Sequence, residues 1–368
     1  MSDAALLEAT EHQARPRVAL KAALAGEASH AYLFRGPRGA GKRAAARAFA
    51  AELLAAAAAD PEDARRRALL DPSPHPDLVW LAPTGAQHMV EEVRERVIRA
   101  AAYRPFEGGK RVFVIEAAEA MRDESQNALL KTLEEPPEFV HLILLNSDGE
   151  GLLETVASRC QAVEFAPLPA AVLEGELVRE GAEAEAAAAV ARLAAGDLER
   201  ARLLLAERGR EFRGEVERCL AAALEGKCGA APWKALLERA QAAGADTEAE
   251  AREALEEESK AGIKRSAKEI NDGAKRAGRR RRTEILDLGF ELCAAWLRDL
   301  AAVAAGAEEV VFNRDRLAGL RDQAEGLDPA AARRGAELVQ ETRRGLQLNV
   351  SEELALEALF FRLETLLA

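Results

Sequence analysis

The segment HAYLFRGPRGAGKR, residues 30–43, decides the fold of this chain. It begins with a short apolar run, passes through a glycine-rich turn and enters an alanine-rich stretch, Lys42 to Ala59, that favours helix. A glycine-rich loop between a strand and a helix is the setting of a P-loop, where backbone N–H groups and the helix N-terminus surround phosphate. The predicted phosphate-binding residues are Gly36, Gly39, Gly41 and Lys42.

Position 43 departs from this motif. The residue after a P-loop lysine is normally Ser or Thr, whose hydroxyl binds Mg²⁺, whereas this chain has Arg43. A guanidinium group offers only donors and cannot coordinate a cation. We therefore expect Arg43 to line a degenerate site that requires no cofactor, and the pattern leaves open whether ATP or ADP binds there weakly.

Two further apolar runs, Val112 to Ile115 and Leu142 to Leu145, are separated by segments of helical character. Continuous apolar runs of this length are typical of strands buried on both faces of a parallel sheet. The helical segments, Val90 to Ala102 and Asp123 to Glu135, alternate with these strands, which predicts an α/β domain over residues 1–166.

The run from Val112 to Ile115 is followed by Glu116 and Ala117, where a Walker B motif would place an aspartate for Mg²⁺ and then a glutamate that polarises water. Glu116 replaces the aspartate with a longer side chain, and Ala117 has no group that could act as a base. Because phosphoryl transfer depends on metal placement and water orientation, these changes and Arg43 predict little or no ATP hydrolysis by this chain.

The chain becomes helical after Pro167-Leu168-Pro169, which predicts a small helical lid over residues 167–207. A glycine and an aspartate, Gly196-Asp197, should end one helix of this lid and cap the next. Residues 208–368 form a third, all-helical domain in this interpretation. Its last segment carries an apolar stripe that must be buried, either in an internal core or against another subunit: Leu356, Leu359, Phe360, Leu363, Leu366 and Leu367.

A charged arm is predicted near residues 248–283. Glu248 to Glu258 is acidic, and a basic continuation runs from Lys260 through Lys264 and Arg265 to Arg282. Opposite charges one turn apart favour a long solvated helix or a mobile arm. The alternative is a contact with nucleic acid or an acidic partner, but no aromatic residue between Lys260 and Arg282 could stack on bases.

Net charge, cysteine spacing and the lack of long apolar segments argue against several classes of function. The formal net charge of −12 disfavours DNA binding by the chain alone. The four cysteines form no CxxC pair, which argues against a zinc site and a disulfide framework. The first residues have no apolar core suited to a signal peptide, and no later segment resembles a membrane span. We expect a cytoplasmic protein with no metal and no membrane partner.

Three segments, His30 to Pro37, His75-Pro76-Asp77-Leu78 and Arg104 to Arg111, carry a family resemblance. They resemble the bacterial DNA polymerase III clamp-loader family, an AAA+ family. The most specific part of the resemblance is QNALLKTLEEPP, residues 126–137, which is similar to a signature of delta-prime and gamma/tau subunits. The end of the chain, with Asn349-Val350 and Leu354 to Leu363, resembles the helical collar through which such subunits form a ring.

The resemblance implies roles for individual residues. Ser158-Arg159-Cys160 is similar to the family's SRC segment, whose arginine reaches the γ-phosphate bound by the adjacent subunit, so Arg159 is the expected arginine finger with Ser158 beside it. Asn146 matches a polar sensor position of the family. The stretch from Ala50 to Leu70 contains none of the cysteines that hold zinc in relatives, so no zinc is expected.

These departures favour a non-motor, delta-prime-like subunit that helps load a sliding clamp onto primed DNA, with gamma/tau and delta subunits as partners. The second sensor is also altered, because Gly196-Asp197-Leu198-Glu199 stands where motor subunits carry Gly-Ser-x-Arg, and Arg200 follows one place later. The alternative is an active AAA+ ATPase of the gamma/tau motor type. A nucleic-acid-binding protein that uses the basic arm is a third possibility.

Overall fold

The computed structural model describes residues 4–26, 28–83, 87–147, 151–260, 266–346 and 351–367. The chain folds into two compact units, Met1–Leu168 and Pro169–Ala368. Predicted features at Lys264, Arg265 and Asn349-Val350 lie outside the described residues. Among the described residues, no helix is both long and apolar enough to cross a membrane.

The first unit is built on a five-stranded parallel sheet with the strand order β2-β3-β4-β1-β5. The central strands β3 and β4 are buried along their whole length. The sheet comprises β1 (Ala31–Arg35), β2 (Leu78–Leu81), β3 (Arg111–Ile115), β4 (Val140–Asn146) and β5 (Gln161–Glu164). The predicted α/β fold with a parallel sheet, followed by helical regions, is confirmed.

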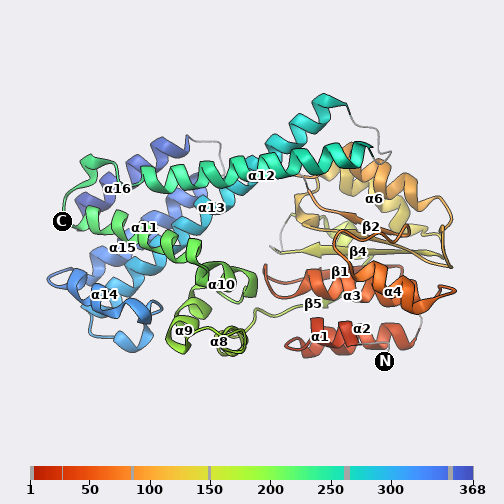
Figure 1. Cartoon of the computed structure of the whole chain (residues 1–368), viewed down its shortest axis with the longest axis horizontal. Helices are drawn as coiled ribbons and strands as arrows, with labels where there is room; N and C mark the ends of the chain where they lie inside the picture. The colour runs from red at the N-terminus through yellow and green to blue at the C-terminus, as the bar shows by residue number, and fades with distance from the viewer. Residues whose placement is uncertain are drawn as a thin grey trace. The chain divides into compact units, whose positions relative to one another are not determined.

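Helices cover both faces of this sheet (Figure 1). Because side chains alternate along a strand, Tyr32 and Phe34 of β1 enter the core under one layer, whereas Ala31 and Leu33 enter the other. The first layer contains α1 (Ala4–Ala9), α2 (Ala14–Ala25), α3 (Lys42–Ala55) and α4 (Pro61–Leu69). The second contains α5 (Val90–Val93), its π-helical continuation Arg94–Arg99, and α6 (Asp123–Glu134). A 3₁₀ turn, Ala118–Ala120, and the short helix α7 (Glu154–Ala157) complete the unit.

One predicted helix ends earlier than expected, and another changes its geometry part of the way along. The alanine run after Lys42 leaves the helix at Ala55, since Asp60 then caps a new helix by accepting from the backbone N–H groups of Glu62 and Asp63. The helix that begins at Val90 changes to π-helical geometry at Arg94. The edge strands β2 and β5 were not predicted from the sequence.

The described residues of the second unit form α-helices joined by turns and by the 3₁₀ turns Cys228–Ala230, Glu308–Val310 and Arg314–Arg316, with no strand among them. Gly196 has a left-handed backbone, and the Asp197 carboxylate accepts from the Arg200 N–H at 3.0 Å, so the predicted break is confirmed. Its first helices are α8 (Ala170–Arg179), α9 (Ala184–Leu193), α10 (Leu198–Leu205) and α11 (Glu207–Leu224). The others are α12 (Lys234–Lys260), α13 (Ala267–Ala304), α14 (Leu317–Ala324), α15 (Pro329–Leu346) and α16 (Glu352–Leu367). Its separation into a lid and a collar stays a prediction.

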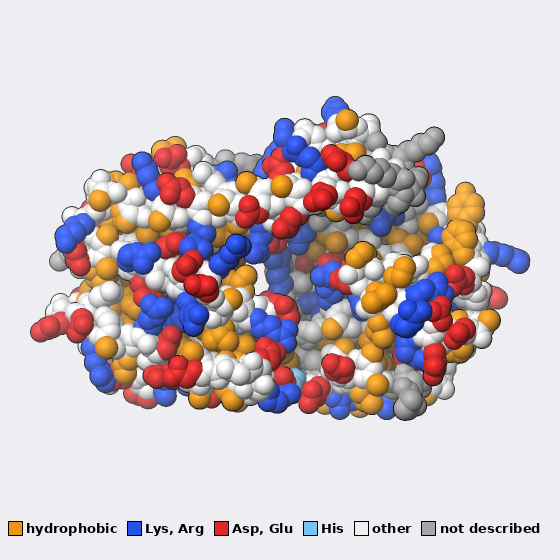
Figure 2. All heavy atoms as spheres, viewed as in Figure 1, with side chains coloured by type: hydrophobic (Ala, Val, Ile, Leu, Met, Phe, Trp, Pro, Cys, Tyr) orange, Lys and Arg blue, Asp and Glu red, His pale blue; other side chains and the backbone are white. Residues whose placement is uncertain are grey.

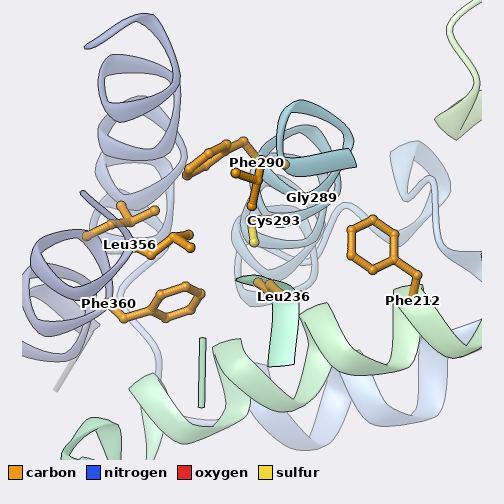
Figure 3. A pocket seen from close by; sticks show the side chains of 9 residues that line it. Phe212, Leu236, Gly289, Phe290, Cys293, Leu356 and Phe360 are labelled. Carbon is orange, nitrogen blue, oxygen red and sulfur yellow. The ribbon is translucent and has the colours of Figure 1, made fainter. Parts of the chain in front are cut away.

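The apolar stripe of α16 lies in the internal core of the second unit. Leu356, Leu359 and Phe360 line a small apolar cavity of about 10 Å³ together with Phe212 and Phe290 (Figure 3). A cavity of this size and polarity has no room for a ligand. The sequence left open whether this stripe is buried in an internal core or against another subunit. For these three side chains the structure shows the internal core.

The charged arm forms part of a helical hairpin. Helices α12 and α13 run antiparallel, because Gly244 lies against Gly278 while Leu255 lies against Gly273. Arg252 pairs with Glu248 at 2.9 Å, one turn away. Acidic and basic side chains are interspersed over this hairpin (Figure 2). The predicted pairing of opposite charges is present among its described residues.

Candidate functional site

Three sequence-predicted elements meet at one edge of the sheet. The P-loop follows β1, Glu116 follows β3, and Asn146 is the last residue of β4. These strands are neighbours, and Arg35 pairs directly with Asn146. The carboxyl edge of a parallel sheet is where open α/β folds bind ligands. The fold therefore brings the P-loop, the Walker B position and the sensor position together.

The P-loop backbone depends on glycine. A Cβ at Gly36 would lie 2.2 Å from the carbonyl oxygen of Phe165, so only glycine allows β1 to pass so close to the end of β5. Gly39 and Gly41 both have left-handed backbones, with φ of 71° and 87°. Lys42 is buried, and its ammonium group donates to the carbonyl oxygens of Gly36 and Pro37, the latter at 2.6 Å. The loop thus has the shape of a phosphate cradle, with its lysine folded against it.

Arg43 forms an ion pair with Glu116. Its Nε lies 2.7 Å from Oε1 of the carboxylate, and the same oxygen accepts from Trp80 Nε1 at 2.6 Å. Arg43 also reaches Asp71, whose Oδ2 lies 2.9 Å from its Nη2. Arg43, which stands where the motif would have a hydroxyl, is therefore paired with Glu116, the carboxylate at the Walker B position.

The residues present do not fit Mg²⁺. This ion needs oxygen ligands at about 2.1 Å in octahedral geometry. Arg43 brings a positive charge to the place where the motif would supply a hydroxyl, and it already neutralises Glu116. Ala117, which follows, has a left-handed backbone with φ 47° and a side chain without polar atoms. No metal-dependent step can be assigned to this set of residues.

Sequence reasoning missed three residues that surround Arg43. Arg47 lies over the Trp80 ring, 4.2 Å from its centroid, and pairs with Asp71 at 2.9 Å. Burial lowers the pKa of Arg47, while the neighbouring carboxylate of Asp71 opposes this shift. Arg47 recurs one helical turn after Arg43, which is the only local signal that could have pointed to it.

Asn146 is 1% exposed at the end of β4, between the strands that lead to the P-loop and to Glu116. Its place at the carboxyl edge is compatible with a polar sensor. The role itself stays a prediction.

Arg159 lies at the opposite edge of the sheet. It precedes β5, whose first residue, Gln161, pairs with Tyr32 near the beginning of β1. The five residues of β1 span about 13 Å at roughly 3.3 Å per residue, and they separate this edge from the P-loop. Arg159 is thus not brought together with the other predicted site residues.

The Arg159 side chain is held at the surface. Its Nη2 donates to Oε1 of Glu134 at 2.7 Å, and its Nη1 donates to the carbonyl of Thr155 at 2.9 Å. The Ser158 hydroxyl donates to the same carbonyl at 3.3 Å. Burial raises the pKa of the adjacent Cys160 thiol to about 12, which keeps it protonated at neutral pH. In the segment Ser158-Arg159-Cys160, the Arg159 guanidinium group is therefore the charged group that can interact with another charge.

Arg200, next to the altered second sensor, is engaged within the second unit. Its guanidinium group forms an ion pair with Glu291 of α13. Glu291 also pairs with Arg343 of α15 at 2.7 Å. These contacts give Arg200 a packing role between helices.

Comparisons with known proteins place residues 13–169 in a family model described as DNA polymerase III, delta subunit. The delta′ subunit of DNA polymerase III from Pseudomonas aeruginosa is 38% identical over 187 residues, which are 48% of this chain and 56% of that protein. The delta′ subunit from Bacillus subtilis is 32% identical over 157 residues, 41% of this chain and 46% of that protein. This chain thus spans about half the length of these relatives. A solved DNA polymerase III gamma subunit-related protein from Thermotoga maritima has 16% identity and a TM-score of 0.43, covering 95% of this chain and 99% of that one.

Proposed function

We propose that this chain, whose amino-terminal unit matches the family model described as DNA polymerase III, delta subunit, acts as a non-motor, delta-prime-like subunit of a clamp loader. In this role it assembles with gamma/tau and delta subunits and helps them load a sliding clamp onto primed DNA. It hydrolyses no ATP itself. Its contribution to catalysis is Arg159, which it supplies to the ATP site of a neighbouring motor subunit.

The Arg43–Glu116 ion pair carries the non-motor assignment. It places a guanidinium group against the carboxylate that would hold Mg²⁺, at 2.7 Å. Phosphoryl transfer in P-loop proteins depends on that metal and on an oriented water. The chain also has Ala117 where a water-orienting carboxylate would stand. These residues argue against the alternative of an active motor subunit.

The position of Arg159 supports action in trans. The arginine lies at the edge of the sheet opposite to the P-loop of its own chain, with its side chain 37% exposed. A guanidinium group delivered across an interface can stabilise the charge that develops on a transferred phosphoryl group. Breaking the exposed pair with Glu134 costs little, since such pairs contribute about 0 to 1 kcal/mol.

Nucleotide binding at the degenerate loop is a separate matter. Gly39, Gly41 and Lys42 keep the elements of a phosphate cradle, so we propose that any ATP or ADP bound there is held without Mg²⁺. Such binding would be structural, and the function above does not require it.

Turnover by the purified chain tests the assignment. With ATP and Mg²⁺ it should release phosphate at the rate of the buffer blank, and its addition to cognate gamma/tau and delta subunits should restore DNA-stimulated hydrolysis. A robust magnesium-dependent rate from the chain alone would establish the motor alternative instead.

A further inference from the structure

The loop that follows the π-helical turn exposes two aromatic side chains. Phe106 is 75% exposed and Tyr103 is 68% exposed, and among the described residues no other large hydrophobic side chain is as exposed as Phe106. This loop, residues 103–110, begins four residues after the last π-helical residue, Arg99, and carries the Arg104 to Arg111 motif up to the start of β3. Isolated exposed apolar residues need no explanation, but two exposed aromatic side chains that line one groove favour a contact surface.

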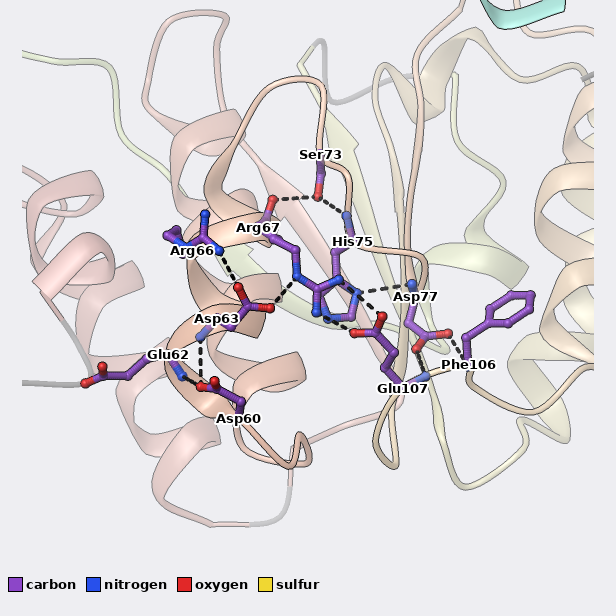
Figure 4. A network of polar contacts seen from close by, with 10 residues as sticks. All are labelled: Asp60, Glu62, Asp63, Arg66, Arg67, Ser73, His75, Asp77, Phe106 and Glu107. Carbon is purple, nitrogen blue, oxygen red and sulfur yellow. Dashed lines mark hydrogen bonds and ion pairs between the residues drawn. The ribbon is translucent and has the colours of Figure 1, made fainter. Parts of the chain in front are cut away.

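Hydrogen bonds to a buried carboxylate hold the backbone of this loop in place. Asp77 is completely buried, and its two carboxylate oxygens accept from the N–H groups of Phe106 at 2.8 Å and Glu107 at 2.7 Å (Figure 4). Arg67 pairs with the Glu107 carboxylate, and a Cβ at Gly108 would lie 2.6 Å from the carbonyl of Ala57. The Phe106 ring points away from this network (Figure 4).

These bonds already order the backbone at Phe106 and Glu107 in the folded chain. The entropy of ordering the backbone is lost on folding and is not lost again on binding. Rigid presentation of an exposed aromatic ring is therefore a property that favours association.

Phe106 and Tyr103 border a groove of about 470 Å³. We call it the Phe106 groove, and it is lined by Glu95, Arg99, Ala100, Tyr103, Arg104, Phe106 and Arg111. Grooves of this size accommodate one or two bulky groups. The guanidinium group of Arg111 lies 5.4 Å from the centroid of the Phe106 ring, and its Nε is buried without a hydrogen-bond partner in the described structure. The π-helical turn supplies Glu95 and Arg99, and such turns are frequent at functional sites.

The charges of the groove identify its occupant. Arg99 is already paired with Glu95, and Arg111 is 7% exposed. Arg104 is exposed and makes no ion pair with the residues that the structure describes. Arg111 has no ion pair with these residues either, but it is buried, so Arg104 is the groove's exposed unpaired cation among them. One such cation suits a single carboxylate, whereas a nucleic-acid strand needs several phosphate contacts and is repelled by a chain of net charge −12. Aromatic residues and arginine are also the side chains enriched in protein interfaces.

We propose that the Phe106 groove docks a segment of a partner protein in which a bulky apolar side chain stands next to a carboxylate. The apolar side chain packs against Phe106 and Tyr103, and the carboxylate pairs with Arg104. This site is distinct from the carboxyl edge of the sheet and does not depend on the role of Arg159.

Peptide selection tests the docking site. A phage-displayed library of random 12-residue peptides is panned on the intact chain, and enriched peptides are made with a fluorescent label for anisotropy titrations. We expect enriched peptides in which an apolar residue neighbours Asp or Glu, with binding weakened about tenfold or more by Phe106→Ala, as for a central interface residue. Arg104→Ala should weaken binding several-fold and abolish the preference for the acidic residue.

Val18→Ala is the matched control, because Val18 is 69% exposed on α2 and outside the groove. It should leave binding unchanged, and all variants should melt like the parent chain, since the backbone bonds to Asp77 remain. Two results would overturn the proposal: enriched peptides that bind Phe106→Ala as well as the parent, or no enrichment over a blank surface. A labelled single-stranded dT oligonucleotide that binds the parent chain but not Phe106→Ala would assign the groove to nucleic acid instead.

Discussion

Arg159 and Glu134 form an ion pair, with 2.7 Å between Nη2 and Oε1, at the edge of the sheet that lies opposite to the chain's own P-loop. Glu134 is the last residue of α6, and the contact of His30 with the Leu133 carbonyl places this helix end beside the start of β1. Both partners are exposed enough to separate without burying a charge. The pair holds the arginine at the surface of this unit.

The Arg159–Glu134 pair should contribute little to stability. Arg159→Ala is expected to change the free energy of unfolding by less than about 1 kcal/mol in urea titrations, since both side chains are exposed. Arg213→Ala is the contrast, because Arg213 is 4% exposed and donates to Asn313 and Asp315 at 2.9 Å. Losing that buried partner should cost about 3 to 5 kcal/mol. Equal effects of the two variants would contradict the surface role of Arg159.

Removing the Arg43–Glu116 pair should not create an ATPase. Arg43→Thr supplies the missing hydroxyl and frees Glu116, but Ala117 still has no group that could orient water. Phosphate release by this variant should therefore stay at the level of the parent chain. Only the combined variant, Arg43→Thr with Glu116→Asp and Ala117→Glu, restores all three positions. Magnesium-dependent turnover by Arg43→Thr alone would contradict this expectation, because it would show that hydrolysis does not need a carboxylate in place of Ala117.

The crossing of α12 and α13 should not tolerate a methyl group. A Cβ at Gly244 would lie 2.8 Å from the Gly278 carbonyl oxygen, which is backbone and cannot rotate away. Gly244→Ala is thus expected to lower the melting temperature, although alanine is favoured over glycine inside a helix by about 1 kcal/mol. Gly175→Ala in α8 is the matched control, since nothing lies within 4 Å of the new Cβ. It should stabilise the chain by up to that amount, and similar shifts for both variants would rule out the close crossing.

Acidification should destabilise the first unit. Burial, with the Arg67 charge as a smaller cause, lowers the pKa of His75 below its usual 6.5, and burial lowers the pKa of His141 as well. Below pH 6.5 the unfolded chain binds protons that the folded chain does not, so stability falls as the pH decreases and is unaffected by these groups above it.

Urea unfolding at pH 5.5 and 7.5 measures this effect. His75→Asn should reduce the loss of stability at the lower pH, because one of the two neutral imidazoles is gone. NMR titration of the folded chain should place both imidazole pKa values below 6.5. Stability that stays constant or rises on acidification would contradict the assignment.

The central sheet could be predicted because β1, β3 and β4 are apolar runs buried on both faces. Strand β5 could not, since only Val163 of its four residues is buried and an edge strand carries no apolar run. The glycines of the P-loop and the two changed positions, Arg43 and Ala117, were also visible in the sequence.

The partners of these residues were not visible. Asp71 and Trp80 reach Arg43 from a loop and from β2, through contacts that only the tertiary structure creates. Glu134 belongs to a recognised motif, but its pairing with Arg159 spans 25 residues. The role of buried Asp77 under the 103–110 loop likewise needs the fold, because a lone aspartate in sequence has no preferred partner.

The most direct test of the proposed role measures DNA-stimulated ATP turnover by an assembly of this chain with cognate gamma/tau and delta subunits. We predict that Arg159→Ala leaves the assembly intact but lowers turnover, because an arginine supplied in trans accelerates its site by about 10³- to 10⁵-fold. Arg321→Ala, which removes another exposed arginine paired with Glu308 at 2.6 Å, should have no effect. Full turnover by intact assemblies that contain Arg159→Ala would contradict the central claim.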